Sequence, residues 1–90
     1  MRTKNINELR NYDVYSVKDM IADRIKQVRI RKNVSQPELA KLTGMSRTNI
    51  ANLETGNHNL SIKNLYKICV ALDVEVIDIL PSISVVGDYY

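Results

Sequence analysis

The segment Ser35–Gly56 constrains the fold of this chain more than any other part of the sequence. Ser35, Pro37 and Glu38 have the arrangement of a helix start. The serine hydroxyl can accept a backbone N–H, proline needs no N–H partner in the first turn, and glutamate can reach back to the cap. Gly44 can take a positive φ without steric cost, so it is expected to end this helix. A second helix after a tight turn is therefore predicted.

The second helix of this pair has a polar outer face. We expect the two helices over about residues 36–43 and 47–55, with Ser46 as the cap of the second. Ile50 and Leu53 lie three residues apart and are expected to face inward. The side chains left on the outer face are Arg47, Thr48, Ala51 and Asn52. This combination predicts a helix-turn-helix, in which the second helix can enter the major groove of DNA.

These residues resemble the phage Cro/repressor-like (XRE) helix-turn-helix family. The resemblance extends from about residue 22 to residue 80 and rests on Arg29, Gln36, Leu39, Ala40, Gly44, Ile50, Leu53, Glu54 and Gly56. The run Asn-Leu-Ser-Ile-Lys-Asn-Leu at residues 59–65 is similar to the controller proteins of restriction–modification systems. The resemblance implies an all-α, compact five-helix bundle of the lambda-repressor-like DNA-binding class.

Four serines predict helix starts independently of this resemblance. Each follows an apolar residue and precedes another by four positions, the pattern of an N-cap with a hydrophobic staple. The serines are Ser16, Ser35, Ser46 and Ser61. Beyond the two helices already described, they predict helices over about residues 17–32 and 62–72, and a short fifth helix is expected over 75–80, before Pro81. The expected inner residues are Val17, Ile21, Ile25 and Val28 in the first helix, Leu39 and Leu42 in the second, and Leu65, Ile68, Cys69 and Leu72 in the fourth.

The length and composition suit one domain. Ninety residues, 44% of them hydrophobic, can build one small core. We expect an N-terminal arm over residues 1–15, a helix-turn-helix domain over 16–80 and a C-terminal tail over 81–90. The arm looks irregular in sequence. The tail is compatible with either a short strand or an unstructured segment.

The positive charge is concentrated at the start of the chain. Residues 1–35 carry nine Lys or Arg against four Asp or Glu, although the net charge of the whole chain is only +3. A basic helix that is simply solvated is one explanation. Beside a helix-turn-helix, a surface facing DNA phosphates is the other.

The remaining composition argues against secretion, membrane insertion and catalysis. A single cysteine, Cys69, rules out an internal disulfide, and its apolar helical face predicts a buried thiol. His58 is the only histidine and has no second metal ligand nearby in sequence. No apolar run is long enough for a membrane span. We expect a soluble cytoplasmic protein, bacterial or phage-encoded, with no enzyme activity, cofactor or metal.

Four residues of the recognition helix are the candidates for base contacts. Arginine offers paired donors to guanine, asparagine can pair with adenine, and the threonine methyl can touch thymine. The candidates are Arg47, Thr48 and Asn52, with Asn49 as a weaker one because it points more sideways. For an arbitrary helix, the alternative is a solvated polar face.

The candidates for phosphate contacts lie at helix starts and in one loop. The resemblance implies that Gln36 bonds a phosphate and steadies the first residue of the recognition helix. A helix N-terminus and its cap can also face an anion. The remaining candidates are Ser46, Asn57, His58, Asn59 and Lys63, for which a solvated Asn-rich turn is the alternative. For Arg29 and Glu54 the resemblance implies an internal ion pair rather than DNA contacts.

The leading functional hypothesis is a sequence-specific transcriptional regulator that binds a two-fold DNA operator as a homodimer. One recognition helix reads about four or five base pairs, too few to specify a site. The expected dimer interface is Val76, Ile77, Ile79, Leu80, Ile83 and Val85. The alternative for this segment is that it caps its own core.

A second hypothesis comes from a different class, an antitoxin-type interaction module that regulates its own operon. In that case residues 1–15 or 81–90 would bind a toxin. RNA polymerase is a further partner compatible with a regulator.

Overall fold

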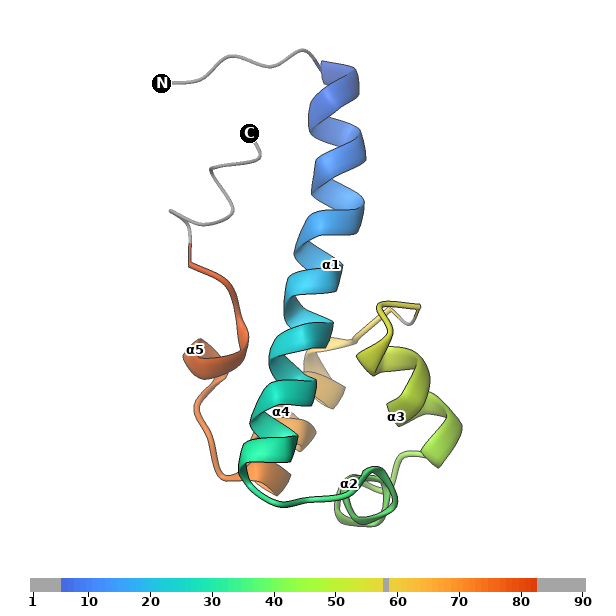
Figure 1. The fold of residues 1–90 in the computed structure, drawn as a ribbon, viewed down its shortest axis with the longest axis vertical. Coiled ribbons are helices and arrows are strands. Elements are labelled where there is room, and N and C mark those ends of the chain that lie inside the picture. Colours follow the sequence, from blue (N-terminus) through green and yellow to red (C-terminus); the bar gives the residue numbers. More distant parts are fainter. Residues whose placement is uncertain (1–5, 58, 83–90) are drawn as a thin grey trace.

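The computed structural model describes the backbone of residues 6–57 and 59–82, and the side chains of residues 17–57 and 59–82 (Figure 1). It contains five helices: α1 (Ile6–Arg31), α2 (Gln36–Thr43), α3 (Arg47–Glu54), α4 (Ile62–Leu72) and α5 (Val76–Ile79). No strand occurs among the described residues. The predicted all-α five-helix fold is therefore confirmed.

Three of the four predicted serine caps are present. Ser35, Ser46 and Ser61 have extended backbones, and each hydroxyl accepts the backbone N–H three residues later at 3.0–3.1 Å. Because a cap fixes where a helix begins, α2 and α4 have the predicted bounds. Helix α3 begins where expected and ends at Glu54, one residue early.

The predicted start of the first helix is wrong. Helix α1 begins at Ile6, so Ser16 lies inside it and most of the expected irregular arm is helical. Residues 6–16 contain neither glycine nor proline, so nothing in their sequence stops a helix that continues from residue 17. Figure 1 shows the N-terminal half of α1 extending beyond the other four helices.

The core lies between all five helices and is aliphatic apart from one thiol. Its members are Ile25, Val28, Leu39, Ala40, Ile50, Leu53, Leu65, Ile68, Cys69, Leu72 and Ile79. All four inner residues predicted for α4 belong to it. In α1, Ile25 and Val28 are fully buried, whereas Ile21 is only partly buried against the core. The burial of these side chains is the main favourable term holding the bundle together.

Helix α2 does not bury the predicted Leu42. That side chain is 60% exposed, and Thr43 is buried instead. The Thr43 hydroxyl donates to the Leu39 carbonyl oxygen at 2.8 Å and accepts the Met45 N–H at 3.2 Å. A buried threonine is tolerated here because its hydroxyl is satisfied by the backbone.

Two helices end at non-glycine residues with positive φ. Asn33 follows α1 with φ 60°, as its tolerance of this region predicts, and Asp73 caps α4 with φ 55°. An L-residue is strained in this left-handed region. Asp73 also places a carboxylate at the negative end of the helix dipole. The backbone conformation and the charge at the C-terminal end of α4 are thus less favourable to the stability of the helix than those at its N-terminal end.

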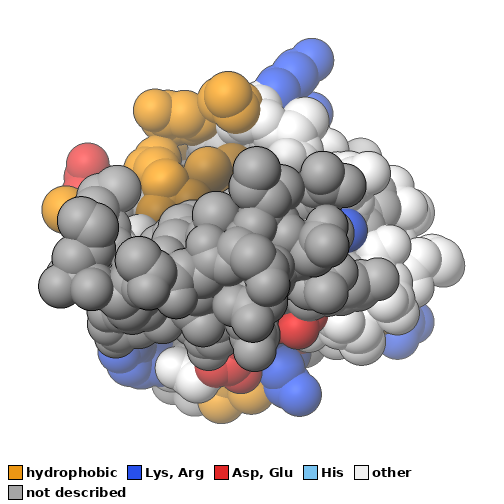
Figure 2. Space-filling model, turned by 90° about the horizontal axis from the view of Figure 1, so that it is seen from above, with side chains coloured by type: hydrophobic (Ala, Val, Ile, Leu, Met, Phe, Trp, Pro, Cys, Tyr) orange, Lys and Arg blue, Asp and Glu red, His pale blue; other side chains and the backbone are white. Residues whose placement is uncertain are grey.

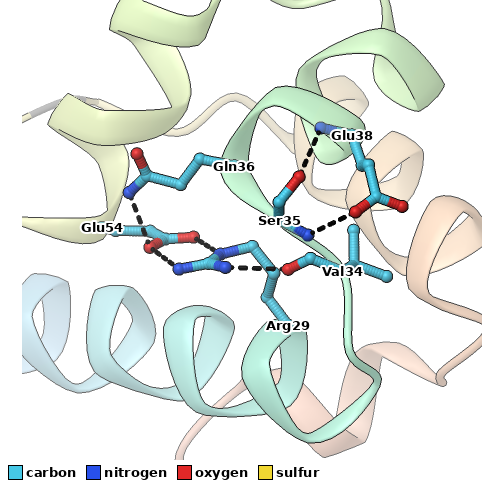
Figure 3. A network of polar contacts seen from close by, with 6 residues as sticks. All are labelled: Arg29, Val34, Ser35, Gln36, Glu38 and Glu54. Atoms are coloured by element: carbon cyan, nitrogen blue, oxygen red, sulfur yellow. Dashed lines mark hydrogen bonds and ion pairs between the residues drawn. The ribbon is translucent and has the colours of Figure 1, made fainter.

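A buried ion pair joins α1 to the end of α3 (Figure 3). Arg29 Nε donates to Glu54 Oε2 at 2.6 Å and Nη2 donates to Glu54 Oε1 at 3.0 Å. Arg29 Nη1 donates to the Val34 carbonyl oxygen at 2.8 Å, and Gln36 Nε2 donates to Glu54 Oε1 at 3.2 Å. The side chains are 11% and 2% exposed for Arg29 and Glu54. The internal pair implied by the family resemblance is present.

The capping box of α2 lies beside this pair (Figure 3). The Ser35 N–H donates to a Glu38 carboxylate oxygen at 3.1 Å, and the Ser35 hydroxyl accepts the Glu38 N–H at 3.1 Å. These bonds from Ser35 lower the pKa of the Glu38 carboxyl. The capping box fixes the start of α2, and the Gln36–Glu54 hydrogen bond holds this start next to the end of α3.

Relief of the strain at Asp73 should stabilise the protein. We expect Asp73→Gly to raise the free energy of unfolding by about 0.5–1 kcal/mol, because glycine takes a positive φ at no steric cost. Asp73→Asn removes only the charge and should give a smaller gain. Urea denaturation of the three proteins measures both effects. Equal gains for the two variants would attribute the effect to charge and not to backbone strain.

Loss of one partner of the buried pair should be much more costly. Arg29→Met should destabilise the fold by about 3–5 kcal/mol, because Glu54 is left as an uncompensated buried charge. Adding Glu54→Gln should recover part of this loss, so a double-mutant cycle should show strong coupling. Arg31→Met, at the exposed end of α1, is the matched control with little expected effect. Additive losses would contradict an energetic link between the two residues.

Candidate nucleic-acid interface

Helix α3 is held by its buried side and presents the other side to solvent. Ile50, Leu53 and Glu54 are buried against α1 and α2. At 100° per residue, Thr48 and Asn52 lie opposite this buried side. The helix is therefore oriented by its apolar residues and its buried carboxylate, and its polar face is left uncovered.

The candidate base-contacting residues have the exposure that a DNA-reading face needs. Arg47, Thr48, Asn49 and Asn52 are all exposed, and their side chains form no hydrogen bond with any described residue. Thr55 continues this face beyond the end of α3, and sequence reasoning did not single it out. Its hydroxyl donates to the Asn52 carbonyl oxygen at 2.8 Å, so it closes the helix.

A shallow depression lies between the start of α2 and the first turns of α3. It is lined by Gln36, Arg47, Thr48 and Ala51, so the structure brings Gln36 beside two base-contact candidates. The Gln36 amide, however, is bonded to Glu54 at the far end of α3 and not to the first residue of that helix. One N–H of the amide remains available to an anion.

The other phosphate candidates are spread over two helix starts and the α3–α4 loop. The Ser46 hydroxyl accepts the Asn49 N–H at 3.0 Å and can still donate its own hydrogen. Asn57, Asn59 and Lys63 are exposed. His58 lies outside the described residues. The Asn59 side chain is bonded to Lys18 of α1. In the sequence, Lys18 stood out only as one of the basic residues of the first third of the chain.

The predicted dimer residues divide between core and surface. Ile77 is 80% exposed and Leu80 is exposed, whereas Ile79 is 0% exposed. The assignment of Ile79 to an interface is therefore wrong, because α5 uses this side chain to close its own core. Val76 is half-buried against that core. Ile83 and Val85 lie outside the described residues.

An apolar stripe on α4 was missed by sequence reasoning. Ile62, Tyr66 and Val70 are 75%, 55% and 80% exposed, and their i, i+4, i+8 spacing places them along one side of the helix. A groove between α4 and the start of α5 is lined partly by Tyr66, Val70 and Val76. Ile77, the next residue of α5, is also exposed. Figure 2 shows hydrophobic side chains gathered at one edge of the molecule. We call these four residues, Ile62, Tyr66, Val70 and Ile77, the α4/α5 apolar surface.

The described residues offer little to catalysis or to a metal. They contain no group of three His, Cys, Asp or Glu side chains able to hold a metal ion. Burial raises the pKa of the Cys69 thiol, and the carboxylates of Glu75 and Asp78 add to the shift. A raised pKa disfavours the thiolate that a nucleophile needs. None of the described helices has the length and apolarity required to cross a bilayer.

Comparison with known proteins identifies the family. The helix-turn-helix family matches residues 25–79. Control protein C.BamHI from Bacillus amyloliquefaciens is 35% identical over 66 residues, which cover 72% of this chain and 82% of that protein. An uncharacterized HTH-type transcriptional regulator from Archaeoglobus fulgidus is 43% identical over 56 residues, covering 62% of this chain and 79% of the relative.

The fold agrees with a controller protein of known structure. The restriction–modification controller protein C.AhdI from Aeromonas hydrophila superimposes with a TM-score of 0.71 at 32% identity, covering 73% of this chain and 100% of that chain. The alignment with this chain includes most of the length of both C.BamHI and the Archaeoglobus relative. The chain therefore belongs to the phage Cro/repressor-like (XRE) family of helix-turn-helix transcriptional regulators, which are DNA-binding proteins and not enzymes.

Proposed function

We propose that this chain is a sequence-specific regulator that binds a two-fold operator as a homodimer, with α3 in the major groove. The observation that carries the proposal is the uncovered polar face of α3, on which Arg47, Thr48 and Asn52 have no partner among the described residues. The regulator would bind its operator DNA in the cytoplasm.

The chemistry of the α3 face suits base reading. The Arg47 guanidinium can donate two parallel hydrogen bonds to guanine O6 and N7, and the Asn52 amide can pair with adenine. Thr48 and Ala51 offer methyl groups to thymine. Asn49 lies at the edge of this face, where it is suited to a neighbouring base or sugar.

Phosphate contacts would fix the position of α3 on the duplex. Gln36 and Ser46 lie at the starts of α2 and α3, where backbone N–H groups already favour an anion. Asn57, Asn59 and Lys63 would hold the backbone beyond the other end of α3, with His58 between them in sequence. Contacts of this kind set register and orientation but carry no sequence information.

The dimer would form through the α4/α5 apolar surface. Four large apolar side chains that are each more than half exposed on two adjoining helices of a 90-residue chain are unusual for a monomer, and exposed apolar surface of this kind marks interfaces. A second copy is the expected occupant because one α3 reads too few base pairs to select a site. A two-fold dimer would place both copies of α3 in major grooves about 34 Å apart.

Replacement of Arg47 should change specificity at one position of the operator. We expect Arg47→Ala to cost about 1–3 kcal/mol of binding free energy at a single base pair, with folding unchanged because the side chain is exposed. Selection of bound duplexes from a random pool, for the wild type and for the variant, measures this preference. Lys41→Ala, on the exposed last turn of α2, is the matched control. A uniform loss across all selected sequences would assign Arg47 to phosphate contact.

Charges on the α4/α5 apolar surface should dissociate the dimer. We expect Val70→Asp with Ile77→Asp to give a folded monomer with much weaker operator binding, because both side chains are exposed in the single chain. Leu42→Asp, an exposed apolar residue on α2, should leave the dimer intact. Sedimentation velocity and circular dichroism check assembly and folding. An unchanged dimer in the double variant would exclude this surface as the interface.

A further inference from the structure

A hydrogen bond links the first helix to the loop that follows the recognition helix. Lys18 Nζ donates to Asn59 Oδ1 at 3.1 Å, although the two residues are 41 positions apart. A second contact lies close by: the Asp19 carboxylate lies against Gly56, where a side-chain carbon would come within 2.6 Å of its Oδ1. Helix α1 therefore reaches the α3–α4 loop at two points.

The packing beneath the Lys18–Asn59 bond is incomplete. A cleft of about 180 Å³ lies there, lined by Lys18, Ile21, Ala22, Leu53, Asn59 and Leu60. A volume of this order exceeds that of several water molecules, so close-packed neighbours do not enclose the Asn59 side chain on this side. Leu60 packs against the core and fixes the backbone beside Asn59, whereas the direction of the exposed Asn59 side chain depends on its polar link to Lys18.

The chemistry of the bond determines how the Asn59 amide is turned. An ammonium group can only donate, so the oxygen of the amide must face Lys18. The NH₂ group, with two donors, then points away from Lys18. Its hydrogens are not bonded to any described residue, and Asn59 is exposed. An outward pair of N–H donors matches the acceptor oxygens of a phosphate group.

Other groups favourable to an anion follow Asn59 in the chain. Ser61 caps α4, an eleven-residue helix, and Lys63 is exposed in its first turn. Both lie within four residues of Asn59, at the positive end of the helix dipole. The Asn59 amide thus adds oriented donors to a region that already attracts negative charge.

We propose that Lys18 is a positioning residue for DNA binding: it holds Asn59 with its amide N–H groups directed at a backbone phosphate. This inference rests on the proposed function, since it requires Asn59 to contact DNA. The inference adds a residue of α1 to the proposed DNA interface. Lys18 precedes the segment matched by the family, which starts at residue 25. Lys18 acts through Asn59 and not by its own contact with the phosphate.

The test uses the full-length protein and a DNA duplex of arbitrary sequence, about two helical turns long, at low salt, because phosphate contacts do not depend on sequence. We expect Lys18→Met to weaken binding about three- to tenfold, the range for loss of one hydrogen bond. In an Asn59→Ala background the same substitution should have no further effect. Lys18→Arg, which can still donate to Asn59, should retain most of the affinity.

Two controls separate positioning from charge and from folding. Lys26→Met removes the same charge from an exposed site on α1 and should leave affinity nearly unchanged. Asn59→Asp keeps a partner for Lys18 but has no N–H donors, so it should bind DNA more weakly than the wild type while its thermal unfolding midpoint is not lowered. The midpoint of Lys18→Met should equal that of the wild type, since an exposed bond adds little stability.

The outcomes are distinguishable. An equal loss from Lys18→Met in the wild-type and Asn59→Ala backgrounds would overturn the inference and make Lys18 a phosphate contact in its own right. Wild-type affinity for Lys18→Met would also overturn it, with DNA binding itself unaffected. Failure of the wild-type protein to bind any duplex would instead overturn the proposed function.

Discussion

Arg29 reaches from α1 to the last residue of α3 and meets Glu54 in a buried, bidentate ion pair. Removing both charges from water is costly, and the pair is tolerated because the surrounding donors and acceptors are satisfied by Val34 and Gln36. Apolar attraction is non-directional, and a planar two-point contact adds a fixed direction to the packing of Ile50 and Leu53. The direction in which α3 points therefore depends on this pair, and the DNA-reading face depends on that direction.

The polar and apolar surfaces of the molecule follow from this arrangement. With Ile50, Leu53 and Glu54 turned inward, the polar side of α3 has nothing to cover it. Helix α4 buries one full stripe in the core and still carries a second apolar stripe, Ile62, Tyr66 and Val70, on its outer side. The first surface suits a charged, hydrogen-bonding ligand and the second suits another protein surface. In the function that we propose, DNA reading and assembly would therefore use separate surfaces of one small domain.

The sequence predicted best where the chemistry is local. The caps at Ser35, Ser46 and Ser61 involve residues three positions apart, so their pattern was sufficient to place α2, α3 and α4. Ser16 shows the same pattern but lies within α1, because a cap motif cannot begin a helix that has already started upstream. Leu42 and Ile79 were misplaced for another reason: both are apolar, and only the packing of neighbouring helices decides which side of α2 or α5 is covered.

The sequence by itself determined where α2, α3 and α4 begin, the helix-turn-helix and the identity of its outward polar residues, since capping and periodicity act within a few residues of each other. It also specified the family, because the matching residues stand at fixed spacings. Only the tertiary structure decided that Lys18 meets Asn59, that Gln36 is bonded to Glu54, and that Tyr66 and Val70 of α4 line a groove with Val76 of α5. These relations join residues that are distant in the chain. They arise from how the helices pack, which no local pattern encodes.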